Sequence, residues 1–256
     1  MSPGALEGAV VVVTGGSRGI GREIVLGAVA QGAQVVFCAR RVGPEARAVE
    51  EEAERLGRVD RAVALRADVA CEADVNGLFE AAFQAFARVD VVVNNAAISL
   101  AHLLVSTPLE AWEQVIGTNL TGAFLVARRA VRAFLDQGRG GRIISVGSVT
   151  QYGAPSNAGY AASKGGLRGL TQSIAREYGE RQIQAFLVAG GYADTAIMAD
   201  APELRQRVVR ANPLARLATP AEIASVVLFL AACQAPDLLN GEVWHVSGGL
   251  IDPPVK

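Results

Sequence analysis

Tyr160 and Lys164 are the two residues whose types and spacing best fit acid–base chemistry. They lie four positions apart in the segment YAASK, and residues four apart in a helix project from the same face. A free tyrosine has a pKa near about 10 and is a poor acid or base at neutral pH. Because a neighbouring ammonium stabilises the phenolate and lowers that pKa, the pair is predicted to transfer a proton.

Ser148 ends an apolar run twelve residues before Tyr160, where its hydroxyl is expected to hydrogen-bond the same substrate oxygen. The two histidines, His102 and His245, have no nucleophile or carboxylate motif beside them. Three cysteines also lack histidines at metal-ligand spacing, namely Cys38, Cys71 and Cys233. All five are interpreted as structural residues, so no metal site is predicted.

A glycine-rich turn, TGGSRGIG at residues 14–21, follows an apolar run and precedes a helix-forming segment. Such glycines permit a tight turn, close approach of the backbone to a pyrophosphate, and close packing of helix on strand. The amides at the start of the helix would face the anion. In this context the turn predicts a dinucleotide site. The residues expected to contact the cofactor here are Gly15, Ser17, Arg18, Gly19, Ile20 and Gly21.

The end of the second apolar run bears on the choice of dinucleotide. NAD-binding proteins carry an acidic residue at this point, about 20 residues beyond the turn, whereas this chain has Arg40 and Arg41. With no carboxylate to repel a 2′-phosphate and guanidiniums able to bind it, the predicted cofactor is NADP(H). Arg18 adds a third cation. The alternative is that these arginines are solvated turn residues.

These groups require a fold that alternates strands with helices. Strands are predicted at residues 9–14, 34–38, 61–66, 89–93, 142–146, 184–188 and 242–246, and helices at 21–31, 45–56, 74–86 and 160–178. Two further helices are expected to begin at Thr107 and Thr219, each capped by Thr and followed by Pro and Glu. The predicted fold is one α/β domain, a Rossmann-type doubly wound seven-stranded parallel sheet with helices on both faces.

Composition argues against several classes of partner. The 256 residues carry 24 basic and 25 acidic side chains, which is no basic surplus for binding nucleic acid. The apolar runs are shorter than the roughly 20 residues that cross a bilayer, and the first residues lack a secretory signal. The chain is therefore expected to be cytoplasmic, with no nucleic acid or membrane partner.

Taken together and in order, the motifs resemble the short-chain dehydrogenase/reductase family over essentially the whole chain. The resemblance rests on TGGSRGIG, Asp68, NNAA at residues 94–97, Asn119 in TNLTG, Ser148, YAASK, the pair Asp194-Thr195 and SGG near Ser247. Three positions depart from the family pattern, namely Ala97, Phe186 and Gly190, and the interval from Ser148 to Tyr160 is one residue shorter than in many members. Gly190 replaces a proline, which is expected to loosen the segment below the nicotinamide.

The resemblance implies roles for residues outside the turn. Asn119 would join the catalytic set of Ser148, Tyr160 and Lys164 by holding a water in a proton relay, and Lys164 would also hold the nicotinamide ribose. Asn94 would support the end of its strand. Further cofactor contacts would come from Asp68, Val69, Asn95, Ala96, Tyr160, Lys164, Gly191 and Thr195. A hydride would pass to a carbonyl carbon, and Tyr160 would deliver the proton.

Within the family, the sequence is most similar to the 3-oxoacyl-acyl-carrier-protein reductases. Arg139 and Arg181 match two arginines of that group that contact the acidic carrier protein. The residues expected to border the substrate are mixed and largely uncharged: Ser148, Gln151, Tyr152, Tyr160, Tyr192, Ile197 and Met198. This favours a 3-oxoacyl thioester or another apolar ketone.

Two other functions stay open at this point. One is an alcohol dehydrogenase or ketone reductase of the same family that acts on a free small molecule. The other is a nucleotide-sensing protein without catalysis, which would not need the acid–base residues. The family also implies a homotetramer, built through the long helices that carry Asn119 and Tyr160 and through the C-terminal strand.

Overall fold

The computed structural model describes residues 4–56, 61–194, 202–233 and 237–250. Its seven strands form one parallel sheet in the order β3-β2-β1-β4-β5-β6-β7. The strands are β1 (Val10–Thr14), β2 (Gln34–Ala39), β3 (Ala62–Arg66), β4 (Val91–Asn94), β5 (Gly141–Ser148), β6 (Ile183–Gly190) and β7 (Val243–Val246). The predicted α/β class and doubly wound sheet are confirmed. Strand order reverses between β1 and β4, which is where such sheets leave a crevice at their carboxyl ends.

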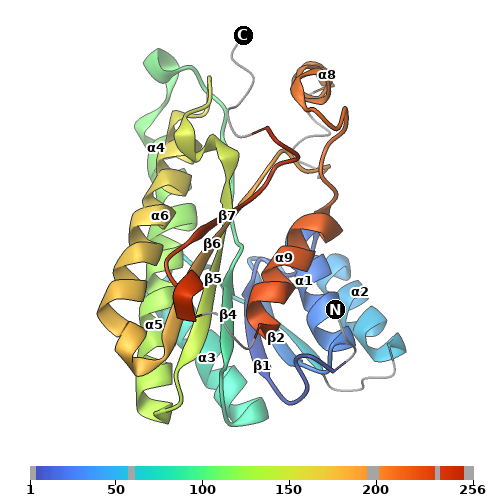
Figure 1. The fold of residues 1–256 in the computed structure, drawn as a ribbon, viewed down its shortest axis with the longest axis vertical. Helices are drawn as coiled ribbons and strands as arrows, with labels where there is room; N and C mark the ends of the chain where they lie inside the picture. The colour runs from blue at the N-terminus through green and yellow to red at the C-terminus, as the bar shows by residue number, and fades with distance from the viewer. Residues whose placement is uncertain (1–3, 57–60, 195–201, 234–236, 251–256) are drawn as a thin grey trace.

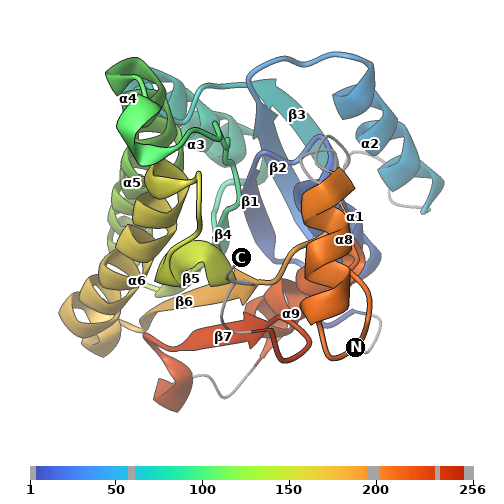
Figure 2. The ribbon, with the colours of Figure 1, turned by 90° about the horizontal axis from the view of Figure 1, so that it is seen from above.

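Helices cover both faces of the sheet (Figure 1). One face carries α1 (Gly19–Ala30), α2 (Pro44–Arg55) and α9 (Pro220–Ala232). The other carries α3 (Glu72–Phe86), α5 (Gly122–Gln137) and α6 (Ala158–Tyr178). Seen from above in Figure 2, the two groups of helices flank the strands, and α4 (Leu109–Ile116) and α8 (Pro202–Ala211) lie on opposite sides.

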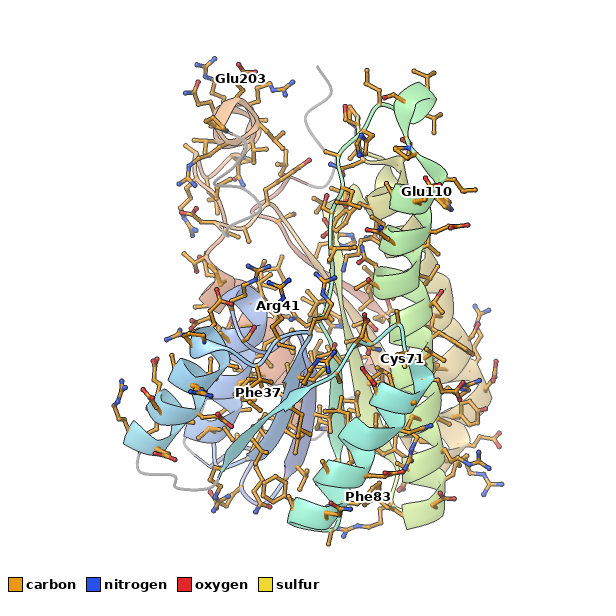
Figure 3. All side chains as sticks on the ribbon, turned by 180° about the vertical axis from the view of Figure 1, so that it is seen from behind. Phe37, Arg41, Cys71, Phe83, Glu110 and Glu203 are labelled. Carbon is orange, nitrogen blue, oxygen red and sulfur yellow. The ribbon has the colours of Figure 1, made fainter. Side chains whose placement is uncertain are left out.

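Two apolar cores explain why the strands are hydrophobic without interruption. Successive side chains of a strand point to opposite faces of the sheet. Val11 and Val13 therefore lie in the core between the sheet and α1 and α9, while Val12 lies in the core between the sheet and α3 and α5. The phenylalanines of α3 lie in this second core as the helical spacing indicates. Phe79 is fully buried, and Phe83, labelled in Figure 3, packs against its edge.

The two Thr-Pro segments behave differently, although their sequences are alike. Thr219 caps α9 as predicted, accepting a hydrogen bond from the backbone N–H of Glu222 while the Glu222 carboxylate accepts one from the backbone N–H of Thr219. The predicted Thr107 cap is wrong. The Thr107 hydroxyl donates to the Leu103 carbonyl of a preceding 3-10 helix, and α4 starts one residue later with Pro108 as its N-cap.

Helix α8 was not predicted from the sequence. Its start does carry recognisable signals, because Pro202 occupies the first turn together with Glu203, and Arg210 lies in the last turn. Val208 is fully buried against Leu217 and anchors the helix to the body of the protein. Figure 3 shows Glu203 on α8 and Glu110 on α4 at the same end of the molecule, on opposite sides.

Candidate active site

A cavity of about 810 Å³ opens along the carboxyl ends of the strands. Its lining comes from the turn after β1, the ends of β2 to β6, the start of α6, and one side of α8. The cavity therefore brings together segments that span most of the chain. Both the glycine turn and the pair Tyr160 and Lys164 line it, as does Ser148.

The glycine turn is shaped by close contacts between the ends of β1 and β4. Gly15 has a φ of +67°, and a Cβ atom there would lie 2.9 Å from the Cα atom of Ala96. A Cβ atom on Gly21 would lie 2.0 Å from the carbonyl oxygen of Gly15. The Asn95 side chain ties the turn down, since its Nδ2 donates to the carbonyls of Thr14 and Gly15, both at 3.0 Å. Gly15 and Gly21 thus leave no room for side chains, which fits the close backbone approach that a pyrophosphate needs.

Most residues predicted to bind the cofactor line this cavity. They are Gly15, Ser17, Arg18, Gly19, Ile20, Gly21, Arg40, Asp68, Val69, Asn95, Ala96, Tyr160, Lys164 and Gly191. Arg41 is exposed and is not among the lining residues (Figure 3). Thr195 lies outside the described residues. The residues present thus fit a dinucleotide, with Arg18 in the glycine turn and Arg40 just beyond β2 as lining cations.

The proton-transfer residues sit between the end of β5 and the first turns of α6. Ser148 is the last residue of β5, and its hydroxyl accepts from the backbone N–H of Thr150 at 3.2 Å and also hydrogen-bonds Tyr160. Lys164 is 3% exposed, and its Nζ donates to the carbonyl of Val146 at 2.7 Å. That Nζ lies 5.5 Å from the centroid of the Tyr160 ring. The helical spacing therefore places the two side chains on one face, as predicted.

Burial sets the protonation of this pair and corrects one expectation. Removal from water raises the pKa of Tyr160 to about 12, an effect that the hydrogen bond with Ser148 partly opposes. Burial also lowers the pKa of Lys164 to about 8. The expected lowering of the Tyr160 pKa by Lys164 is therefore wrong for this structure, because desolvation of the phenolate is the larger effect. Tyr160 is protonated at neutral pH, which is the state that donates a proton.

Asn119 fastens the segment after β4 to α6. It lies in a π-helical turn, Gly117–Thr121, and its Oδ1 accepts from the backbone N–H of Ile98 at 2.8 Å. Its Nδ2 donates to the carbonyl of Ile98 at 2.9 Å and to the hydroxyl of Ser163 at 3.1 Å. Ser163 precedes Lys164, so Asn119 holds the helix that carries the lysine. Asn119 does not line the cavity, and its place in a water relay stays a prediction.

The end of β4 and the end of β6 are also firmly held. The Nδ2 of Asn94 donates to the carbonyl of Ala123 at 3.2 Å, which fixes the end of β4 against α5. Gly190 lies within β6, where it pairs with Ser148 on one side and Val246 on the other. Its expected looseness is thus limited by strand pairing on both sides.

The substrate side of the cavity differs from the sequence prediction. Gln151 and Tyr152 do not line the cavity. They lie in a 3-10 helix, Val149–Tyr152, that turns Thr150 toward the cavity instead. The hydroxyl of Tyr152 hydrogen-bonds Nε2 of His245 at 3.0 Å, and the two rings stack. Tyr192 does line the cavity as predicted, while Ile197 and Met198 lie outside the described residues.

Sequence reasoning missed several residues at this end. Thr150 lines the cavity, and its hydroxyl is buried with no hydrogen-bond partner among the described residues. Leu204 and Arg207 reach the cavity from α8. The loop after β4 joins the loop before α6 through a 2.9 Å hydrogen bond from the hydroxyl of Ser99 to Oδ1 of Asn157. Only α8 had a usable signal, its capping residues, because the other contacts join segments far apart in sequence.

Arg139 and Arg181 lie at the amino ends of β5 and β6, whereas the cavity opens at the carboxyl ends of the strands. Arg139 precedes β5, and Arg181 precedes β6 at the end of a short 3-10 helix, Gly179–Arg181. At roughly 3.3 Å per residue, a strand of eight residues such as β5 separates its two ends by about 26 Å. A carrier protein bound at these arginines would therefore lie far from the cavity of the same chain.

The described part of the chain has no helix that is both long and apolar enough to cross a membrane. Within the same residues, no group of three or more His, Cys, Asp or Glu side chains is placed to hold a metal ion.

Comparison with known proteins agrees with this geometry. A family model described as enoyl-(acyl carrier protein) reductase matches residues 15–251. A 3-oxoacyl-[acyl-carrier-protein] reductase of Synechocystis is 36% identical over 248 residues, which cover 96% of this chain and 98% of the relative. The 3beta-hydroxysteroid dehydrogenase 1 of Eggerthella lenta is 37% identical over 249 residues, 96% of this chain and 94% of the relative.

A solved structure is similar over nearly the whole chain. The 3-ketoacyl-(acyl-carrier-protein) reductase of Brucella melitensis, crystallised with NADH, superposes with a TM-score of 0.89 at 28% identity, covering 96% of this chain and 100% of that chain. The fold and site define a dinucleotide-dependent oxidoreductase. The chain belongs to the short-chain dehydrogenase/reductase family and resembles its 3-oxoacyl-acyl-carrier-protein reductases.

Proposed function

We propose that this protein uses NADPH to reduce a ketone to a secondary alcohol, with a 3-oxoacyl thioester as the substrate class. The observation that carries the proposal is the single cavity that joins the glycine turn to Ser148, Tyr160 and Lys164. A sensor of nucleotides would have no use for a buried lysine one helical turn from a half-buried, protonated tyrosine. Catalysis explains why these costly groups are kept inside the protein.

The mechanism follows from the protonation states of the site. The hydroxyls of Ser148 and Tyr160 hydrogen-bond the ketone oxygen and polarise the carbonyl. A bound reduced nicotinamide supplies the hydride that the carbonyl carbon accepts. As negative charge develops on the oxygen, Tyr160 gives it a proton, and the alcohol is complete. The Lys164 ammonium stabilises the resulting phenolate, and solvent restores the proton to Tyr160.

The preference for NADPH over NADH rests on Arg18 and Arg40. Both line the cavity, and the only acidic lining residue among those described is Asp68, at the end of β3. A guanidinium binds a phosphate through paired, charge-assisted hydrogen bonds, whereas the ribose hydroxyl of NAD gives it no anion to bind. Arg40, which lies directly beyond β2, is the better placed of the two for a 2′-phosphate.

The choice of a thioester draws on the relatives that reduce acyl groups on a carrier protein. A free ketone is the second candidate, because the steroid dehydrogenase of Eggerthella lenta is equally similar. We also propose a homotetramer in the cytoplasm. Phe124 and Leu135 on α5 are 42% and 43% exposed, which suits a helix that packs against another copy of the chain. Light scattering of the purified protein tests the assembly.

The experiment follows oxidation of NADPH and NADH with three probes: acetoacetyl pantetheine, the same acyl group on acyl carrier protein, and a free aliphatic ketone. We expect turnover with NADPH, a lower kcat/KM with NADH, and the highest kcat/KM with a thioester. Turnover of the free ketone alone would favour the second candidate. Binding of NADPH without turnover of any probe would contradict the reductase.

A further inference from the structure

Arg207 is a charged residue of the cavity that the proposed reaction does not use. It lies on α8 and lines the cavity together with Leu204. Tyr192 relates α8 to the reacting groups. It lines the cavity and packs with Leu204 against the small core of Val208, and it lies just beyond the end of β6, where Gly190 pairs with Ser148. Arg207 therefore belongs to the end of the cavity where the substrate carbonyl must lie, across from α6.

The surroundings of Arg207 hold α8 in place, and none of the described residues pairs with this guanidinium. Val208, the next residue, is fully buried in the small core that also contains Leu217. Arg205 forms a two-pronged ion pair with Asp194, with one of its hydrogen bonds at 3.1 Å. Arg207 itself has no ion pair or hydrogen bond with any residue that the structure describes. The helix is thus anchored by its neighbours while Arg207 is free to meet a ligand.

The charges that line the cavity are unevenly distributed. Among the described lining residues the cations are Arg18, Arg40, Lys164 and Arg207, and Asp68 is the sole carboxylate. Asp68 follows β3, beyond the end of β2 that carries Arg40, so it lies at the cofactor end. Among the described lining residues, no carboxylate therefore offsets Arg207 at the substrate end.

We propose that Arg207 selects ketone substrates that carry an anionic group, either a carboxylate or a phosphate, close enough to the carbonyl to reach α8. A guanidinium binds both anions through paired, charge-assisted hydrogen bonds. The inference rests on the proposed reductase function and narrows its substrate class. It also replaces the expectation from the sequence that the substrate side is largely uncharged.

The test uses two pairs of ketones that differ only in the anion. Acetoacetate is compared with its methyl ester, and acetoacetyl 4′-phosphopantetheine with acetoacetyl pantetheine. Each is assayed with the wild-type protein, Arg207→Gln and Arg207→Lys. Arg210→Gln is the matched control, since Arg210 is exposed on the same helix and does not line the cavity. The dissociation constant of NADPH is measured for every variant.

We expect Arg207→Gln to raise KM for at least one anionic probe by about tenfold to a hundredfold, the range for loss of a charge-assisted hydrogen bond. KM for its neutral partner and the affinity for NADPH should stay within twofold, and Arg207→Lys should restore part of the loss. The pair that responds identifies the anion as carboxylate or phosphate. Equal effects on both members of each pair, or no effect, would overturn the proposal.

Two further outcomes separate this proposal from the one on which it rests. Weaker NADPH binding by Arg207→Gln, with unchanged discrimination between the probes, would assign Arg207 to the cofactor and overturn the proposal. If no probe turns over, the reductase proposal fails, but calorimetry with 3-hydroxybutyrate in the presence of NADP⁺ still measures anion binding. Equal affinity of the wild type and Arg207→Gln for 3-hydroxybutyrate, and likewise for 3-hydroxybutyryl 4′-phosphopantetheine, would then overturn the anion site as well.

Discussion

The two ends of the cavity are built in different ways. At the cofactor end, one short turn and the adjoining end of β4 supply a cradle of backbone, in which Gly15 and Gly21 leave no space for side chains. At the substrate end, the lining includes Thr150, which lies in a 3-10 helix after β5, and Arg207, which lies on α8. The first end is a local structure, whereas the second exists only after distant segments have packed. Changes at the first end should therefore affect all substrates alike, and changes at the second should depend on the substrate.

Lys164 lies between the two ends, and its replacement is expected to have a larger effect than the changes at either end. Lys164→Met removes the cation that stabilises the phenolate of Tyr160, so kcat should fall on the order of 10²–10³-fold for every substrate. Because burial lowers the pKa of Lys164 to about 8, wild-type reduction should decline as the pH rises through that value. Lys164→Arg keeps its charge and should extend the plateau of kcat to higher pH.

The same pKa shift predicts how stability varies with pH. The folded protein holds the Lys164 proton with a pKa of about 8, whereas the ordinary value is 10.5. Between these values the unfolded chain binds more protons, so the contribution of Lys164 to the free energy of unfolding rises with pH. Urea unfolding of wild type and Lys164→Met at pH 7 and 10 measures that contribution. For the catalytic prediction, a wild-type kcat that stays constant from pH 7 to 10 would contradict stabilisation of the Tyr160 phenolate by the Lys164 ammonium.

Gly21→Ala tests the cofactor end. Its Cβ atom would lie 2.0 Å from backbone, which cannot move without disturbing the turn, so we expect a loss of about 1–3 kcal/mol in stability. NADPH affinity should fall by about tenfold or more. Gly77→Ala is the control, because no atom lies within 4 Å of a Cβ there and alanine favours helix by about 0.5–1 kcal/mol. Comparable NADPH affinity in the two variants would show that the tight turn does not determine NADPH binding.

Arg40→Gln tests cofactor choice with a smaller expected effect. Loss of one guanidinium should raise KM for NADPH by about tenfold and leave KM for NADH nearly unchanged. Arg41→Gln is the matched control, since Arg41 is the next residue and does not line the cavity. If Arg41→Gln gives the larger change, the sequence expectation that both arginines bind the phosphate holds better than the narrower assignment to Arg40.

The difference between the two ends also explains how much of the fold and the site could be predicted from the sequence. The positions of the strands, the glycine turn and the pair of Tyr160 and Lys164 follow from hydrophobic pattern and fixed spacing, which are local properties. Thr150 lines the cavity and Gln151 does not, and this depends on the direction that the 3-10 helix takes after β5. The pKa of Tyr160 depends on burial by the whole fold, so spacing from Lys164 alone predicted its direction wrongly.

The two Thr-Pro segments give the smallest effect and show the same limit. Thr219→Ala removes a capping hydrogen bond of α9 and should lower the free energy of unfolding by about 1 kcal/mol. Thr107→Ala should cost less than about half as much, because its hydroxyl bonds one carbonyl at the surface and caps no helix. Urea unfolding of both variants measures the difference. Equal losses would mean that the shared sequence outweighs its surroundings.

Tyr160 donates the proton through its hydroxyl, in a site whose affinity for NADPH depends mainly on other residues. The most direct test measures kcat and the dissociation constant of NADPH for wild type and Tyr160→Phe, with acetoacetyl pantetheine as substrate. We expect kcat to fall by at least about 10²-fold, while NADPH affinity changes by less than about threefold. Turnover by Tyr160→Phe at the wild-type rate would contradict proton donation by Tyr160.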